Sequence, residues 1–365
     1  MTARAVLLLA LLSCFALSAH AEPTAERLAV LRHGVNITNW FRFPPNRDPL
    51  AMRAYLGDSA MRDLRRAGFT FVRLPVQPEV LLAPGMLDVL KDSVARLQRH
   101  SLGVVVSLHP ADWHLETTSE DRARLLAVWR TLAPALRPFD PRLTFAEVVN
   151  EPVFPDDPQG WARLQRQVLG EIRASLPANT IVLTGNDWGS IDGLLAAIPE
   201  PDPNVVYSFH LYEPAELTAL AAYRPGLDTE AFARLPFPTD DAAACQTAAA
   251  RTNDPPTASL MRFYCEQHWN VTKLDARIDA VADWGRRNHV ALLAGEFGAS
   301  QRLNAPARLA WLAAVRAACD RRAIGWALWG YDDSMGFALH PPADARHLDR
   351  GVLQALGLPA AMPEQ

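Results

Sequence analysis

The feature that most constrains the fold of this chain is a regular alternation of short apolar runs with longer amphipathic stretches. Solid apolar runs such as Val104-Val105-Val106-Ser107-Leu108 are typical of parallel strands that are covered on both faces. The expected strands are 34–40, 70–74, 103–109, 143–149, 180–184, 205–210, 290–295 and 324–329. Eight strands that alternate with helices predict an α/β fold, a (β/α)8 TIM barrel, with a doubly wound open sheet as the alternative.

Helical spacing of apolar residues appears between the expected strands. In one such segment Leu274, Ile278 and Val281 form a stripe, and Thr272 with Asp275 makes a capping-box-like start. Further helices are expected at 59–67, 86–100, 119–136, 158–176 and 306–322. No glycine-rich phosphate loop follows the first expected strand, which argues against a dinucleotide-binding sheet and favours the barrel.

One connection is much longer than an ordinary loop between a strand and a helix. Residues 213–271 follow the sixth expected strand and are rich in proline. Long insertions of this kind are usually functional or disordered. Because the active sites of barrels lie at the carboxyl ends of the strands, we expect the insertion to form one wall of the site, with a mobile excursion as the alternative.

Length, composition and charge limit the class of protein. At 365 residues, of which 49% are hydrophobic, the chain can bury one large core, so residues 22–365 are expected to form a single domain. The net charge of −4, without a basic run, argues against nucleic acid as a partner. We expect a monomer.

The first 21 residues have the pattern of a secretory signal peptide. Arg4 supplies the charged start, residues 5–17 the apolar stretch, and Ala19-His20-Ala21 a cleavage site before Glu22. Attachment of a lipid at Cys14 is the less favoured alternative. The apolar stretch is too short to span a bilayer comfortably and no later segment is long enough, so we expect a periplasmic or secreted protein.

Three cysteines follow the predicted cleavage site. Cys245 and Cys265 lie in one stretch without clear periodicity, and an oxidising compartment favours their pairing, with two free thiols as the alternative. Cys319 lies on the apolar side of an expected helix, so we expect it to be buried.

Polar and aromatic side chains stand at the ends of the expected strands. In a barrel the carboxyl ends of all strands share one face, where catalytic residues lie. The residues concerned are Arg73, His109, Asn150, Glu151, His210, Tyr212, Glu296 and Trp329. Two carboxylates at this face are suited to acid/base and nucleophilic chemistry on a glycosidic bond.

With these residues the chain resembles glycoside hydrolase family 5, the retaining β-glycanases that include many cellulases. The resemblance runs from Gly34 to Trp329 and is most specific at Asn150-Glu151-Pro152 and Gly295-Glu296-Phe297-Gly298. It implies that Glu151 is the general acid/base, that Glu296 is the nucleophile and that Asn150 holds the sugar 2-hydroxyl. The remaining active-site positions that it implies are Arg73, His109, His210, Tyr212 and Trp329.

Electrostatics agrees with these roles. Two neighbouring carboxylates repel, so one keeps its proton at neutral pH while cations and donors hold the other ionised. We expect Arg73 and the Tyr212 hydroxyl to keep Glu296 ionised, and Glu151 to have the raised pKa.

The two histidines have competing interpretations. His109 and His210 are candidate substrate ligands, with metal ligands or hydrogen-bonded core histidines as alternatives. Hydrolytic barrels that use a metal usually show a His-x-His pair on an early strand, and this sequence has none. We therefore expect no metal and no other cofactor.

Tryptophans are candidates for stacking on the apolar faces of sugar rings. Trp329 is the first candidate, followed by Trp40, Trp113 and Trp188, whereas Trp129, Trp161, Trp284 and Trp311 lie in expected helices and belong to the core.

The sequence thus predicts a secreted, metal-independent retaining glycosidase that is endo-acting on a β-1,4-linked glucan. β-Mannan, β-1,3-glucan and a bacterial exopolysaccharide remain open as substrates, and transglycosylation as a competing reaction. The alternative from another class is a carbohydrate-binding barrel without turnover, against which the presence of both glutamates argues.

Overall fold

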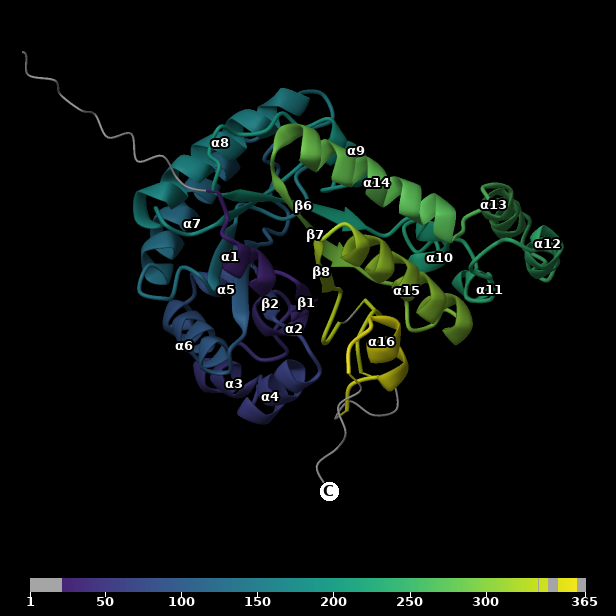
Figure 1. Ribbon diagram of the computed structural model, residues 1–365, viewed down its shortest axis with the longest axis horizontal. Helices are drawn as coiled ribbons and strands as arrows, with labels where there is room; N and C mark the ends of the chain where they lie inside the picture. Colours follow the sequence, from purple (N-terminus) through teal and green to yellow (C-terminus); the bar gives the residue numbers. More distant parts are fainter. Residues whose placement is uncertain (1–21, 334, 341–346, 360–365) are drawn as a thin grey trace, which may run out of the picture.

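The computed structural model describes residues 22–333, 335–340 and 347–359 and contains a closed barrel of eight parallel strands in chain order (Figure 1). β1 pairs with β8 as well as with β2, which closes the sheet. The strands are β1 His33–Asn36, β2 Phe71–Val76, β3 Gly103–Leu108, β4 Thr144–Glu147, β5 Ile181–Thr184, β6 Val205–Leu211, β7 Ala291–Phe297 and β8 Gly325–Leu328. The predicted (β/α)8 barrel is confirmed, and the open sheet is excluded.

Helices surround the ring of strands in Figure 1. The main outer helices are α4 Asp58–Arg66, α6 Met86–Arg99, α7 Ser119–Leu136, α8 Pro158–Ser175, α14 Val271–Asn288 and α15 Ala305–Arg321. Shorter helices are α1 Ala25–Val30, α2 Thr38–Phe41, α3 Pro49–Ala54, α5 Pro78–Leu81, α9 Ile191–Leu195 and α16 Arg350–Ala355. Their apolar faces pack against the outward side chains of the strands, as the periodicity predicted.

Two element boundaries differ from the prediction. α14 begins at Val271, because the Asn270 side chain accepts a hydrogen bond from the Lys273 amide at 3.0 Å; the predicted cap at Thr272 is wrong. β1 ends at Asn36 rather than at residue 40, because the chain turns directly into α2.

The barrel interior is layered. Alternate residues of a strand face inward, and the lower layer, near the amino ends of the strands, is apolar. Its members are Leu31, Phe71, Val105, Phe145, Val182, Val206, Leu293 and Ala327. Two residues further along four of these strands stand Arg73, Ser107, Glu147 and Ser208, all buried. A polar layer therefore lies above the apolar layer, closer to the carboxyl ends of the strands. Apolar packing and α1 close the opposite end of the barrel.

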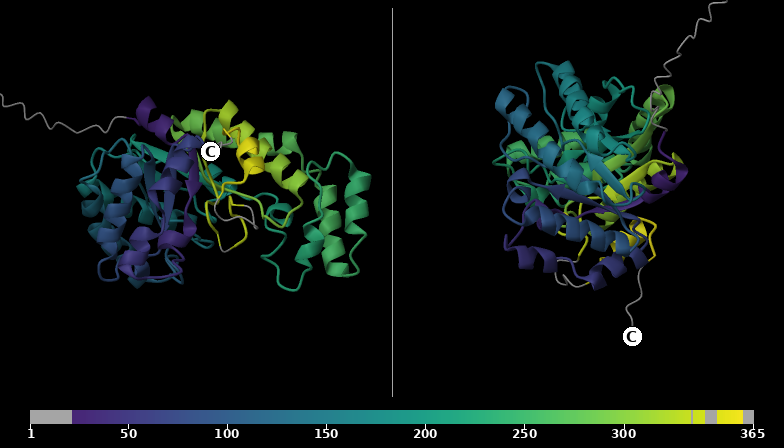
Figure 2. Two further views of the ribbon diagram at one scale, coloured as in Figure 1. Left: turned by 90° about the horizontal axis from the view of Figure 1, so that it is seen from below. Right: turned by 90° about the vertical axis from the view of Figure 1, so that its left-hand side faces the viewer.

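The insertion at 213–271, which was expected to be irregular, consists of four helices joined by loops. It contains α10 Ala215–Thr218, α11 Thr229–Phe232, α12 Ala242–Ala249 and α13 Pro255–Glu266. A disulfide between Cys245 and Cys265 joins α12 to α13. The two helices lie side by side to one side of the barrel and extend away from the end that α1 covers (Figure 2). This places the insertion on the side to which the strands' carboxyl ends point.

The N-terminal signal predicted at 1–21, with Cys14, lies outside the described residues. Within the described ranges, no helix combines the length and the apolar character that crossing a membrane requires.

The cysteine arrangement leads to a first prediction. Burial raises the pKa of the Cys319 thiol to about 12, so this thiol is unreactive in the folded protein. Protein that begins at Glu22, unfolded without reductant and treated with iodoacetamide, should gain one label per chain, and three after reduction. Intact-mass spectrometry reads both numbers, and three labels without reductant would contradict the disulfide.

Candidate active site

Glu151 lies beyond the end of β4 in a strained conformation. Its φ of 43° is in the left-handed region, which costs a non-glycine residue about 1–3 kcal/mol. The chain ahead of it stays bonded to the neighbouring strands, through the Val148 amide to the Val182 carbonyl and the Asn150 amide to the Leu108 carbonyl. This anchored turn leaves the Glu151 side chain 26% exposed at the mouth of the barrel.

Glu296 reaches the same mouth because of a bulge in β7. The pairing with β6 shifts between Phe209 and His210, so that Ala294 pairs with Phe209 and Glu296 with His210, and Gly295 is the extra residue. Leu293 faces inward, and strict alternation would turn Glu296 outward. A Cβ at position 295 would meet the Ser208 Oγ at 2.2 Å, so glycine is required where the bulge re-aims the carboxylate.

Arg73 is the centre of the polar layer. Its guanidinium is fully buried and donates to Glu147 from Nε at 2.6 Å and from Nη2 at 2.7 Å, and to Glu296 Oε1 from Nη1 at 2.5 Å. It also donates to the side-chain oxygens of Asn36, Ser107 and Asn150 at 2.9–3.0 Å. Burial disfavours the charged form, but Glu147 and then Glu296 outweigh it and raise the pKa of Arg73.

The other oxygen of Glu296 faces two further groups. The Tyr212 hydroxyl donates to Glu296 Oε2 at 3.0 Å, and His210 Nδ1 lies 3.5 Å from the same oxygen. His210 Nδ1 also lies 2.8 Å from Glu151 Oε1. Ligand atoms of Glu151, His210 and Glu296 lie within 4.8 Å of one another, so the two carboxyl groups face each other across a short gap.

The protonation of Glu151 differs from the prediction. Burial would raise the pKa of Glu151, but the hydrogen bond and positive charge of His210 outweigh burial and lower it. Burial likewise lowers the pKa of His210, yet the charge of Glu296 and the hydrogen bond that His210 donates to Glu151 raise it overall. The expected raised pKa for Glu151 is therefore wrong for the free protein: the proton of this pair rests on His210.

His109 is buried, and neither of its ring nitrogens has a hydrogen-bond partner among the residues that the structure describes. Burial, together with the positive charges of Arg42 and Arg73, lowers the pKa of His109 well below its usual value, so the ring is neutral. Its ring stands 6.2 Å from that of Trp329, at the end of β8. A neutral buried imidazole with two free nitrogens is suited to a hydroxyl that enters from the mouth.

The predicted stacking tryptophans are separated by the structure. Trp40 lies in α2, is fully buried and donates from its indole to the Met52 carbonyl at 2.8 Å. It therefore belongs to the core, and its assignment as a sugar platform is wrong. Trp188 is 61% exposed. Trp329 is only 2% exposed, with the Arg42 guanidinium over its ring.

Trp188 is held by a strained turn. Asp187, Trp188 and Gly189 have φ values of 60°, 58° and 63° in succession. The Trp188 amide donates to the Pro152 carbonyl at 3.2 Å, and the Gly189 carbonyl accepts from the His210 amide at 2.8 Å. The backbone that carries the exposed indole is therefore bonded to Pro152, the residue after Glu151, and to His210.

Within the described part of the chain, the group best placed to ligate a metal is Glu151, His210 and Glu296. Arg73 and Tyr212 already donate to both oxygens of Glu296, and the guanidinium would repel a divalent cation there. This donor set fits hydrogen bonding within the protein better than metal binding.

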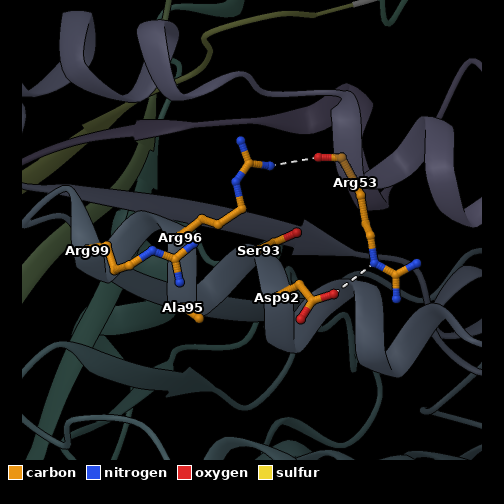
Figure 3. A pocket seen from close by; sticks show the side chains of 6 residues that line it. All are labelled: Arg53, Asp92, Ser93, Ala95, Arg96 and Arg99. Carbon is orange, nitrogen blue, oxygen red and sulfur yellow. Dashed lines mark hydrogen bonds and ion pairs between the residues drawn. The ribbon is translucent and has the colours of Figure 1, made fainter.

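A separate pocket lies between α3 and α6, outside the barrel (Figure 3). Among the described residues, two of its three arginines have partners: Arg53 pairs with Asp92 at 2.8 Å, and Arg96 donates to the Arg53 carbonyl at 2.7 Å. It contains none of the strand-end residues.

Sequence reasoning missed three residues of the site. Glu147 and Asn36 hold Arg73, and Arg42 reaches Trp329 from the loop after α2. Glu147 had a usable signal, because it stands two residues after Phe145 on the inward side of β4, where a carboxylate needs a partner. Arg42 had none, because its place depends on a loop.

Comparisons with known proteins agree with this geometry. A model of the cellulase family, glycosyl hydrolase family 5, matches residues 32–334. Endoglucanase 3 of Fibrobacter succinogenes is 26% identical over 85% of this chain, which spans about half (51%) of that protein. Endoglucanase C of Acetivibrio thermocellus is 22% identical over 82% of this chain and 90% of its own length. The structure of Thermotoga maritima Cel5A with mannotriose superposes with a TM-score of 0.72 at 21% identity, over 91% of this chain and 99% of that one.

The buried ion network leads to a second prediction. Arg73→Met leaves the Glu147 and Glu296 carboxylates buried without their cation, so the free energy of unfolding at pH 7 should fall by about 3–5 kcal/mol. The loss should shrink as the pH falls, because the stranded carboxyls then take up protons. Urea denaturation at pH 5 and pH 7 measures both effects.

Arg53→Met is the matched control. Its partner Asp92 is more than half exposed, so this variant should lose less than about 1 kcal/mol. Equal losses in the two variants would contradict the special role of Arg73.

Proposed function

Because the chain belongs to glycosyl hydrolase family 5, we propose that it is a retaining endo-β-1,4-glucanase that cleaves by double displacement, with Glu296 as nucleophile and Glu151 as acid/base. The observation that carries this proposal is the short gap between the carboxyl groups of Glu151 and Glu296, whose oxygens come within 4.8 Å. Retaining enzymes hold their two carboxyl groups about 5–5.5 Å apart, whereas inverting enzymes leave about 6.5–9.5 Å for a water molecule.

The surroundings of Glu296 support its role as nucleophile. Arg73 donates to one oxygen and Tyr212 to the other, so the carboxylate is held ionised and in one orientation. The bulge at Gly295 fixes the backbone that carries it. In this proposal Glu296 attacks the anomeric carbon, and the glycosyl–enzyme ester that forms is later hydrolysed by water.

The Glu151–His210 pair supports the acid role, although the proton rests on His210 in the free protein. One proton is shared across 2.8 Å. A sugar that covers the pair excludes water, and a drier surrounding favours the neutral arrangement over two separated charges. The proton then moves to Glu151, which donates it to the leaving oxygen and afterwards removes one from the attacking water.

The remaining site residues suggest how a sugar chain lies. Trp188 is anchored beside the acid/base, so we propose that it stacks on the leaving-group side of the scissile bond. His109, Asn150 and Trp329 are proposed to hold the sugar that becomes attached to Glu296, since Asn150 and Glu296 both accept from Arg73 and the His109 ring lies beside that of Trp329. Stacking on Trp329 requires Arg42 to move or to share the site, since the ring is covered.

The substrate is the finer part of the proposal. The relatives named endoglucanases favour a β-1,4-glucan, whereas the Cel5A structure with mannotriose keeps β-mannan open. β-1,3-Glucan and an exopolysaccharide also remain, because loops rather than catalytic residues set the polymer. A barrel that binds sugar without turnover is disfavoured by the ordered hydrogen bonds of both glutamates.

Export and a monomeric state are also proposed. The disulfide of the insertion is suited to an oxidising compartment. The intact mass of protein exported by cells that express residues 1–365 distinguishes cleavage before Glu22 from a lipid on Cys14, and sedimentation tests the monomer.

The pair leads to a pH prediction. Because the pKa of His210 is raised above 6.5, the pair keeps its proton to beyond that pH, so the alkaline fall of kcat/KM should lie above pH 6.5. In His210→Gln, Glu151 titrates alone, and the fall should move to lower pH. His100→Gln, a histidine outside the site that pairs with Asp58, is the control and should leave the profile unchanged. An unmoved profile in His210→Gln would remove the pair from proton transfer.

The function itself is tested on soluble polysaccharides. The wild-type enzyme should release a ladder of oligosaccharides from β-1,4-glucan. Glu296→Ala should lose about four or more orders of magnitude in kcat, as expected for a missing nucleophile, and azide should restore cleavage with an inverted glycosyl azide as product. Glu171→Ala, which removes a partly exposed glutamate of α8 that pairs with Arg130, is the control and should keep full activity.

Different outcomes remove different parts of the proposal. Cleavage of mannan but of no β-glucan would overturn the substrate and leave the mechanism. Release of single terminal sugars only would overturn the endo action. Full activity in Glu296→Ala would remove Glu296 from the chemistry.

A further inference from the structure

We propose that Arg42 makes the sugar site beside Trp329 selective for a carboxylate-bearing sugar, so that the natural substrate is an anionic β-glycan. This inference rests on the proposed glycanase function and narrows its substrate class. It concerns the side of the site that holds the sugar to be attached to Glu296.

The Arg42 guanidinium lies over two aromatic rings. Its Cζ stands 4.7 Å from the centre of the Phe43 ring and 5.4 Å from that of Trp329. Arg42 is itself partly buried, whereas Trp329 is only 2% exposed. The guanidinium thus lies where a neutral sugar would stack on Trp329.

Arg42 has no carboxylate partner within the described ranges. Of the acids around the site, Glu151 is engaged with His210, Glu296 with Arg73 and Tyr212, and Asp333 with the Phe337 amide and the Trp329 indole. By contrast Arg124, which lies 4.5 Å over the Trp113 ring, pairs with Asp121 at 3.1 Å. At the other site, the arginine that lies over a tryptophan ring therefore also has a carboxylate partner, which Arg42 lacks among the described residues.

His109 provides a second, independent observation. It is 4% exposed, its ring lies beside that of Trp329, and neither nitrogen has a partner. A buried polar side chain without a partner at the same place indicates that a ligand completes the site. A sugar bound beside Trp329 would bring a hydroxyl group to His109 and another substituent of the sugar ring to Arg42.

Desolvation decides which substituent fits. A neutral sugar that covers Arg42 strips water from a charged group and returns only weak hydrogen bonds, which is unfavourable. A carboxylate matches the planar guanidinium with two parallel hydrogen bonds and cancels its charge. The site as built therefore favours a carboxylate over a hydroxyl at this position.

The same charge bears on catalysis. After the effects of burial and His210, the positive charge of Arg42 is among the causes that lower the pKa of Glu151. A carboxylate bound to Arg42 cancels this charge and helps Glu151 to hold the proton that it must donate. An anionic sugar should therefore raise kcat as well as lower KM.

The experiment compares two soluble β-1,4-glucans of equal length, one oxidised at C6 to contain glucuronic acid units and one unoxidised. The wild-type enzyme should show a kcat/KM about 10- to 100-fold higher on the oxidised glucan, the range expected for a charged hydrogen-bonded pair. Arg42→Gln should abolish this ratio. Arg47→Gln removes an equal charge from an exposed position in the same loop and should retain it.

Other results overturn the inference in distinct ways. A wild-type ratio near one, unchanged in Arg42→Gln, leaves a glycanase without carboxylate selectivity. Arg42→Gln activity that rises equally on both glucans makes Arg42 a lid over Trp329. If neither glucan is cleaved, the proposed function fails, and calorimetry with tetrasaccharides of the two kinds decides the inference alone: tighter binding of the oxidised sugar that is lost in Arg42→Gln supports it, and equal binding overturns it.

Discussion

The site depends on one buried cation. Arg73 sits in the barrel interior between Glu147 and Glu296, fully out of contact with water. A buried charge is tolerated only with partners of opposite sign and satisfied hydrogen bonds. Glu147 makes Arg73 stable in the interior, and Arg73 in turn makes a second carboxylate, Glu296, tolerable beside it. Glu147, a buried residue of β4, therefore helps to hold Glu296 in place through Arg73.

Strand alternation turns this requirement into geometry. Inward positions at one height are apolar, and those one step higher are polar, so the apolar layer beneath supports the ion network from one side. The carboxylates at the mouth need departures from that regularity. Glu296 faces inward because of the bulge at Gly295, and Glu151 because of a left-handed backbone. Regular strand alternation thus positions Arg73, whereas a bulge positions Glu296 and a left-handed residue conformation positions Glu151.

The parts predictable from the sequence are those set by local pattern. Apolar runs and helical periodicity gave all eight strands and the main helices, and the placement of polar residues at strand ends gave most of the site. Trp40 was misassigned because the turn into α2 depends on tertiary packing. Glu151 was expected to be the protonated group because the contact with His210, between residues far apart in sequence, is invisible in a linear pattern. Arg42 was missed because a loop, and no periodicity, brings it to Trp329.

The unexpected protonation of Glu151 and the missed Arg42 both concern the charges around the site. Around Glu151 and Glu296 stand Arg73, His210 and Arg42, and each of them shifts the pKa of a neighbouring group. Arg73 pairs with both Glu147 and Glu296, and His210 pairs with Glu151. These three carboxylates balance the three cations in number, so Arg42 differs from the other two cations in its contacts and not in the net charge of the site. No described carboxylate pairs with Arg42 directly, and the proposed selectivity for a carboxylate-bearing sugar depends on this unpaired guanidinium above Trp329.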